Sequence, residues 1–383
     1  METSNIIMIA FFLLLSTLIL VFRKKLQFQS FMKIFYFGMY KTKIGLKLMD
    51  TWAKKYPRLL NRICYAAIIT GFVGMIVVVF DLARSLYSVI AGTSTLTVGL
   101  VLPVQAKGVF YVPFAYWIIA ILVILVLHEF SHGLIARLHK IKVNSSGVAF
   151  LGIIIPIIPA AFVEPDEKQL RHASRFKQLS VYAAGPFANI VFGFVFLGIF
   201  ALLLNPFANS LYNYEGVKIS DFMGNDSPAE MSGLAVGDVI TEINGNTVTD
   251  AEDFKASLDD AKPKDIVEIK TEQATFAATL KEDPVEKDAF LGVWVDNEKT
   301  LKNESIFSYA TVWITDLFYW LFLLNLGVGL FNLVPLGPID GGRMFQVALE
   351  RIMHTHKAKR VWHTVSFIVL AIIVSNIVYA FLA

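Results

Sequence analysis

Six long apolar stretches constrain the fold of this chain more than any other feature of its sequence. A helix needs roughly 17–25 apolar residues to cross the hydrocarbon layer of a bilayer, and each stretch is close to or above that length. Of the 383 residues, 56% are hydrophobic and 17% are charged, whereas a soluble domain has about 25% charged residues. The sequence therefore predicts a multi-pass α-helical membrane protein with about six transmembrane helices, over residues 5–22, 64–79, 114–138, 179–204, 306–334 and 361–382.

The first apolar stretch is expected to stay in the protein as a membrane anchor. It is followed directly by Arg23, Lys24 and Lys25. A cleaved signal peptide has the opposite order, with basic residues before its apolar core and small residues after it.

Residues 143–162 are apolar, but their composition opposes a spanning helix. Gly147, Gly152, Pro156 and Pro159 interrupt the stretch, and proline in particular breaks a helix. Non-helical backbone is tolerated at membrane depth where it packs against protein. We therefore expect a re-entrant, β-like segment here.

Residues 205–305 differ in composition from the rest of the chain. They contain 21 Asp and Glu residues against 9 Lys, a net charge of −12, and all other residues together carry +15. Short β-rich runs at 239–243 and 266–269 alternate with turn signals such as Asn244-Gly245. This pattern predicts an inserted soluble α+β domain.

We accordingly expect four segments. An N-terminal transmembrane extension with two spans comes first, and the soluble insert divides the membrane core that follows. The segments are 1–110 for the extension, 111–204 for the first part of the core, 205–305 for the insert and 306–383 for the second part of the core.

The charges of the connecting loops predict the orientation. Lys and Arg concentrate in 23–62, 137–177 and 343–360, which lie on one side if six spans alternate. Short loops rich in Lys and Arg face the cytoplasm, so both termini and the acidic insert are expected to face outward. Basic residues beside spans bind anionic lipid headgroups, and nucleic acid is not needed to explain them.

An H-E-x-x-H motif stands in the third apolar stretch, at His128, Glu129 and His132. On a helix, residues four apart share a face, so both imidazoles can bind one Zn²⁺ while Glu129 takes a proton from a water at the metal. The bare motif is weak, because on a soluble helix two surface histidines beside a salt-bridging Glu are about as good an interpretation. Ionisable groups inside an apolar span are costly and usually functional, and this favours the metal site.

A catalytic zinc site needs a third protein ligand. The single cysteine, Cys64, excludes a thiolate-rich site, and the remaining histidines lie in basic stretches or one turn too far along the helix. The best candidate is Asp340, which stands between two prolines and the pair Gly341-Gly342 at the end of the fifth span. Taken alone, such an Asp is better interpreted as the N-cap of the next helix. Because the chain also contains H-E-x-x-H, we favour Asp340 as a zinc ligand.

The two motifs together resemble those of the site-2 protease family of intramembrane metalloproteases. The hallmarks of that family are H-E-x-x-H in one helix and N-x-x-P-x-x-x-L-D-G in another. The second motif matches residues 332–341, with Ile339 in place of the usual Leu. The resemblance covers about residues 110–350 and implies one Zn²⁺ per chain held by His128, His132 and Asp340, with Glu129 as the general base.

Two further strings resemble segments of the same family. Residues 185–189 resemble its G-P-x-x-N, and residues 161–165 resemble the segment after its re-entrant strands. Asn332 matches the family's Asn near the substrate. We expect Asn332 and Asn189 to contact the substrate or to donate hydrogen bonds to the oxyanion.

The acidic insert has a resemblance of its own. Residues 227–245 are similar to the PDZ pattern S-P-A-x-x-x-G-L-x-x-G-D-x-I-x-x-I-N-G. PDZ domains bind peptides by adding a strand to an open sheet edge, so the insert is expected to recognise or exclude substrates. The alternative is an unrelated small β-rich domain.

These resemblances imply an intramembrane zinc metalloendopeptidase that cuts in or near transmembrane segments. The loop charges and the place of His132 near the inner end of its span predict a zinc site toward the cytoplasm. The implied partners are transmembrane protein substrates, the lipid bilayer and an upstream site-1-type protease. A metal transporter is one alternative, but it would need further metal-binding residues along a path, and the other spans supply almost none. A catalytically inactive scaffold is another, but it would normally have lost Glu129 or a ligand.

Overall fold

The computed structural model describes residues 3–22, 24, 26–31, 35–91, 99–152, 156–224, 226–283 and 287–382. It divides into two compact units. The membrane unit is Met1–Phe200 with Asp316–Ala383, and the acidic unit is Ala201–Thr315. The expected segments 1–110, 111–204, 205–305 and 306–383 remain a proposal.

In the described part of the chain, five helices are long and apolar enough to cross a membrane. They correspond to the last five predicted spans, so the multi-pass helical architecture is confirmed. The predicted spans 179–204 and 306–334 run a few residues past the ends of their helices, which lie at Ile199 and Phe331. The first predicted span forms helix α1 (Thr3–Phe22), whose apolar part Ile6–Phe22 is shorter, so a sixth span remains a prediction. The five are α3 (Pro57–Ile90), α4 (Phe114–Leu138), α6 (Arg175–Ile199), α10 (Ile306–Phe331) and α12 (Thr355–Leu382).

Helix α3 shows how these helices use an apolar surface on all sides. Ala67 and Met75 are buried in a cluster with Leu333. On the outside of the same helix, Ile76 and Phe80 are 70% and 69% exposed. A helix at the surface of a soluble protein has a polar outer face. An apolar outer face instead suits contact with lipid.

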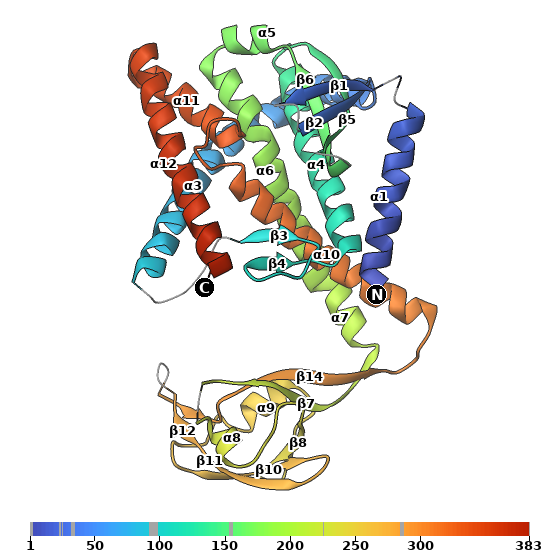
Figure 1. The fold of residues 1–383 in the computed structure, drawn as a ribbon, viewed down its shortest axis with the longest axis vertical. Coiled ribbons are helices and arrows are strands. Elements are labelled where there is room, and N and C mark those ends of the chain that lie inside the picture. The colour runs from blue at the N-terminus through green and yellow to red at the C-terminus, as the bar shows by residue number, and fades with distance from the viewer. Residues whose placement is uncertain are drawn as a thin grey trace. The chain divides into compact units, whose positions relative to one another are not determined.

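A four-stranded antiparallel sheet lies near α5 (Glu167–His172) in the membrane unit (Figure 1). The strand order is β1-β2-β5-β6, so β6 is an edge strand. The expected β-like segment is confirmed as the hairpin β5–β6, with 153–155 outside the described residues. The strands are β1 (Gln27–Phe31), β2 (Phe35–Thr42), β5 (Val143–Gly152) and β6 (Pro156–Pro165).

Strands β1 and β2 differ from the sequence-based expectation, which places only a basic loop after the first span. β2 pairs with β5 from Tyr36 opposite Gly152 to Thr42 opposite Ser146. Gly147 permits this pairing, because a Cβ at that position would overlap the carbonyl oxygen of Tyr40. The N-terminal extension therefore pairs with one edge of the β5–β6 hairpin. The other, open edge of β6 has no strand partner among the described residues, although α4 and α1 pack against this strand.

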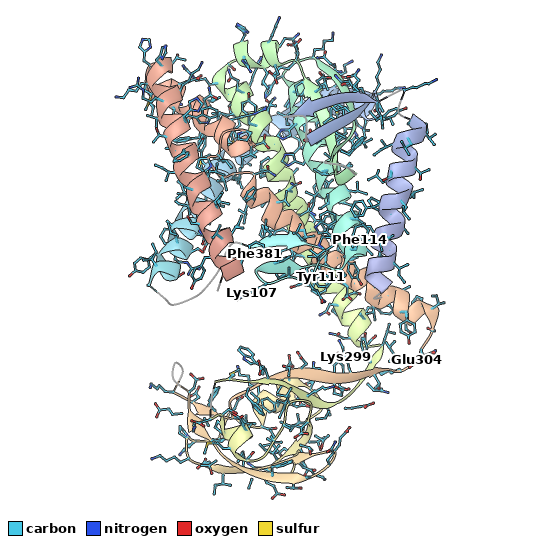
Figure 2. The ribbon with its side chains drawn as sticks, in the orientation of Figure 1. Lys107, Tyr111, Phe114, Lys299, Glu304 and Phe381 are labelled. Atoms are coloured by element: carbon cyan, nitrogen blue, oxygen red, sulfur yellow. The ribbon has the colours of Figure 1, made fainter. Side chains whose placement is uncertain are left out.

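Two short parallel strands, β3 (Leu100–Leu102) and β4 (Val109–Tyr111), come directly before the first residue of α4 in the chain. The turn between these strands touches the end of α12, where a Cβ on Gly108 would lie 2.5 Å from the carbonyl oxygen of Ala380. Figure 2 shows Lys107 and Phe381 close together at this contact. Phe114, the first residue of α4, is 1% exposed within an apolar cluster, so the start of the H-E-x-x-H helix is firmly packed.

The acidic unit contains a six-stranded sheet with two short helices, α8 (Pro228–Met231) and α9 (Ala251–Ala256). The predicted Asn244-Gly245 turn is confirmed, since both residues have positive φ, 51° and 80°, as a tight hairpin turn requires. The sheet order is β11-β10-β8-β7-β14, with β9 paired to β8. These strands are β7 (Tyr212–Phe222), β8 (Val239–Ile243), β9 (Asn246–Thr247), β10 (Ile266–Thr271), β11 (Thr275–Thr279) and β14 (Val293–Leu301).

Candidate metal centre

Three side chains from two helices converge in the membrane unit. His128 and His132 lie one turn apart on α4, and Asp340 is the first residue of α11 (Asp340–Ile352). The Oδ2 atom of Asp340 lies 3.0 Å from His128 Nε2 and 3.2 Å from His132 Nε2, and the two Nε2 atoms are 3.0 Å apart. In the described part of the chain this is the one group of His, Cys, Asp and Glu residues found close enough to hold a metal ion.

The backbone around Asp340 explains the two glycines that follow it. The N–H of Gly341 donates to the carbonyl of Asn332 at 2.7 Å, and a Cβ on Gly341 or Gly342 would overlap the backbone of Leu333 or Leu336. Neither glycine is among the residues with positive φ. The pair therefore permits a close approach of two backbone segments, and Asp340 at the start of α11 reaches the two histidines of α4.

The donor set fits Zn²⁺. Tetrahedral zinc with bonds of about 2.0–2.1 Å places neighbouring ligand atoms about 3.3 Å apart, close to the edges of the triangle formed by the two Nε2 atoms and Oδ2. The histidines are 8% and 9% exposed. Two imidazoles and a carboxylate face one point inside an apolar helix bundle, where ionisable groups are costly and usually functional. A divalent cation would suit this donor set.

Helix α6 holds the outer nitrogens of both histidines. His132 Nδ1 lies 2.6 Å from the carbonyl oxygen of Val181, and His128 Nδ1 lies 3.1 Å from the side-chain amide of Asn189. Gly185 stands midway between these contacts, where a Cβ would overlap His132 Nε2 and lie 2.7 Å from His128 Nε2. The Gly-Pro string thus allows α6 to pass directly behind the imidazoles.

Glu129 lies on the side of α4 that faces strand β6. Its Oε2 atom accepts a hydrogen bond from the backbone N–H of Val163 at 2.9 Å. Because β6 pairs with β5 on its other side, this N–H belongs to the open edge of the sheet. The carboxylate is thereby held next to the three converging side chains.

A cavity of about 980 Å³ opens onto these groups. The open edge of β6 contributes residues 162–165 to its wall, and Tyr182, Asn332 and Arg343 line it as well. At the same wall, hydrogen bonds from Ser145 and from Lys41 hold the pKa of Glu164 below its ordinary value. Charged side chains, among them Glu164 and Arg343, therefore lie at the same cavity as the three converging groups.

The structure brings together His128, Glu129, His132 and Asp340 as the sequence predicts. Asn332 lines the cavity, and its Nδ2 donates to the carbonyl of Val328 on its own helix at 3.0 Å. Asn189 is fully buried and is not among the described residues that line the cavity.

Three groups at the site are absent from the sequence-based prediction. Tyr182 and Arg343 could have been noticed, since each lies within three residues of a predicted motif residue or motif string. The carbonyl of Val181 could not, because a backbone atom carries no residue-type signal.

Comparison with known proteins gives a consistent picture. The profile of Peptidase family M50 matches residues 116–375, more than half of the chain. An uncharacterized protein of Methanocaldococcus jannaschii is 30% identical over 346 residues, covering 89% of this chain and 84% of the relative. The zinc metalloprotease RasP of Shouchella clausii is 27% identical over 245 residues, so the match spans 50% of this chain and 55% of RasP.

Solved PDZ domains match about a fifth of this chain. The PDZ domain of an SdrC-like protein from Listeria monocytogenes is 26% identical, covering 21% of this chain and 88% of that domain with a TM-score of 0.20.

Proposed function

The chain belongs to peptidase family M50, and on that basis we propose that it is an intramembrane zinc metalloendopeptidase. Its substrates would be membrane proteins, cut in or near their transmembrane segments. The observation that carries this proposal is the convergence of His128, His132 and Asp340 beside a cavity that also holds Glu129. One zinc ion per chain satisfies this donor set.

The residues of the site divide the work of hydrolysis between them. A bound zinc ion supplies a Lewis acid and lowers the pKa of a bound water toward about 7. Glu129 takes the proton from the attacking water and returns it to the leaving amine. The amide of Asn332 is proposed to hydrogen-bond the substrate backbone, and its place at the cavity wall supports this role.

The edge of β6 is the proposed docking site for the substrate. A peptide carbonyl inside a helix is hydrogen-bonded to its own chain, so a transmembrane substrate must unwind before attack. An open strand edge offers backbone donors and acceptors to such an extended segment. Because β6 contributes residues to the cavity wall, a strand added there would run past Glu129.

The acidic unit is proposed to recognise or exclude substrates as a PDZ-like domain. Its support is the sequence pattern at 227–245 together with the confirmed Asn244-Gly245 turn. Ser227 caps α8 by accepting the N–H of Glu230 at 3.1 Å, which explains the leading Ser of the pattern. A domain of this kind would suit substrates already trimmed by an upstream site-1-type protease.

Metal removal tests the proposed function. We expect the purified chain to contain one zinc per molecule and to cleave a synthetic transmembrane peptide reconstituted in the same detergent micelle. Dialysis against a chelator should abolish cleavage, and added Zn²⁺ should restore it. A chain that binds no zinc, or that cleaves equally well after the metal is stripped, would show that the proposal is wrong.

The proposed orientation has its own test. From the charge pattern we propose that the acidic unit lies outside the cell and the loop before α12 inside it. Cys64, the single cysteine, is buried, and in a Cys64→Ser background we expect Glu252→Cys to react with a membrane-impermeant maleimide on intact cells. Lys357→Cys should react only after permeabilisation. The reverse labelling pattern would invert the topology.

A further inference from the structure

The outer nitrogens of the two histidines are held by groups on one face of α6. Val181, Gly185 and Asn189 follow each other at intervals of four residues, and residues four apart lie on the same side of a helix. The carbonyl of Val181 serves His132, and the amide of Asn189 serves His128. The Nδ1 atom of each histidine therefore has a contact on α6, which is a backbone carbonyl for His132 and a side-chain amide for His128.

The position of the ring protons follows from the geometry. Both Nε2 atoms point toward Asp340 and toward each other at 3.0–3.2 Å, so Nε2 is the atom that each histidine offers to a metal. A neutral imidazole that binds through Nε2 carries its proton on Nδ1 and needs an acceptor there. For His132 that acceptor is the carbonyl of Val181.

His128 likewise needs a hydrogen-bond acceptor for its Nδ1–H, and Asn189 is the residue that faces this nitrogen. The Nδ2 end of this amide faces His128 Nδ1 at 3.1 Å, and the Oδ1 atom has no hydrogen-bond partner among the described residues. With the proton on Nδ1, an N–H would then face an N–H. The two ends of an amide have the same shape, and half a turn of the group brings Oδ1 to Nδ1–H. In either orientation one end of the amide has no partner among the described residues. Only the turned orientation replaces two opposed donors by a hydrogen bond.

Burial separates this role from contact with the substrate. Asn189 is 0% exposed and lies behind the ring of His128, on the side away from Asp340. Asn332, by contrast, lines the cavity. A group that donates to a reacting carbonyl must reach the cavity, and of these two amides the structure gives that access to Asn332.

We propose that Asn189 is a positioning residue for the metal, which fixes the ring of His128 by accepting its Nδ1–H through Oδ1. This inference rests on the proposed zinc function and assigns Asn189 a role different from oxyanion stabilisation. Groups that hold the outer nitrogen of a metal-bound histidine are typically worth about 10–100-fold in metal affinity.

Two substitutions distinguish the roles. Asn189→Asp keeps an acceptor and removes the donor, and Asn189→Leu has a similar size with neither. We expect Asn189→Leu to weaken zinc binding about 10–100-fold, and Asn189→Asp to bind zinc within a few-fold of the unmodified chain. Zinc affinity is measured on the full chain in detergent by competition with a chromogenic chelator. Circular dichroism of the metal-free variants checks that each is folded.

The opposite results would overturn the inference. If Asn189→Leu binds zinc as the unmodified chain does, the ring of His128 does not depend on the amide. If both variants keep full zinc affinity and lose cleavage, Asn189 acts as a donor to the reaction. If Asn189→Asp loses as much zinc affinity as Asn189→Leu, acceptance by Oδ1 is not its role. A failure of the unmodified chain to bind zinc would instead count against the proposed function.

Discussion

Replacing Glu129 by Gln should leave the zinc content unchanged and lower the rate of peptide cleavage by about 10²–10⁴-fold, the usual contribution of a general acid–base group. The amide of Gln cannot take a proton from water. It can still accept the hydrogen bond that Val163 N–H donates to Glu129 at 2.9 Å, so the local structure should persist. The loss should appear in kcat, because Glu129 is not one of the three converging side chains.

The measurement is a single-turnover cleavage assay with a metal count on the same preparation. Glu304→Gln is a matched control, since it makes the same chemical change at an exposed residue outside the membrane unit (Figure 2). Glu304→Gln should cleave at the unmodified rate. A Glu129→Gln variant that retains zinc and cleaves as fast as this control would remove Glu129 from the mechanism.

The residue types of the site could be predicted from the sequence because their chemistry leaves few choices. Two histidines four residues apart on an apolar helix lie on the same face, where one metal ion can bind both imidazoles. Asp340 could be added since the carboxylate stands in a Pro/Gly segment at the end of another span. In both cases the cost of ionisable groups within the membrane narrows the interpretation.

The four-stranded sheet could be predicted only in part. The prolines and glycines of residues 143–162 oppose a helix and signal extended backbone, whereas the pairing of β2 with β5 joins segments more than 100 residues apart. No local pattern encodes such a partner. Strand β2 also ends in the basic segment that follows the first span, where the charges suggest a loop.

The surroundings of His128 and His132 could not be predicted from the sequence either. The G-P-x-x-N string points to Asn189, but whether that side chain faces the cavity or the back of an imidazole depends on how α6 rotates against α4. In the structure, three residues of α6 settle this rotation. Val181 contributes a backbone carbonyl, Gly185 contributes only the lack of a side chain, and Asn189 contributes its amide. Neither the carbonyl nor the missing side chain has a signature that composition or spacing could reveal.

We therefore expect substitution of Gly185 to lower the affinity of the site for zinc. In Gly185→Ala the added methyl would overlap His132 Nε2 and lie 2.7 Å from His128 Nε2, so α6 must move away from α4 or the rings must rotate. Overpacking of this kind costs about 1–3 kcal/mol. If that cost falls on the zinc-bound state, it corresponds to a decrease in zinc affinity of about fivefold to more than a hundredfold.

The matched control is Gly198→Ala on the same helix, where a Cβ meets nothing within 4 Å. Alanine inside a helix is favoured over glycine by about 0.5–1 kcal/mol, so this variant should be slightly more stable and bind zinc normally. Zinc titration of both variants, with circular dichroism of the metal-free forms, separates a displaced ligand from an unfolded helix. Equal zinc affinity in Gly185→Ala and Gly198→Ala would mean that the bundle accommodates the methyl group without moving the imidazoles, and the close passage of α6 would then have no part in building the site.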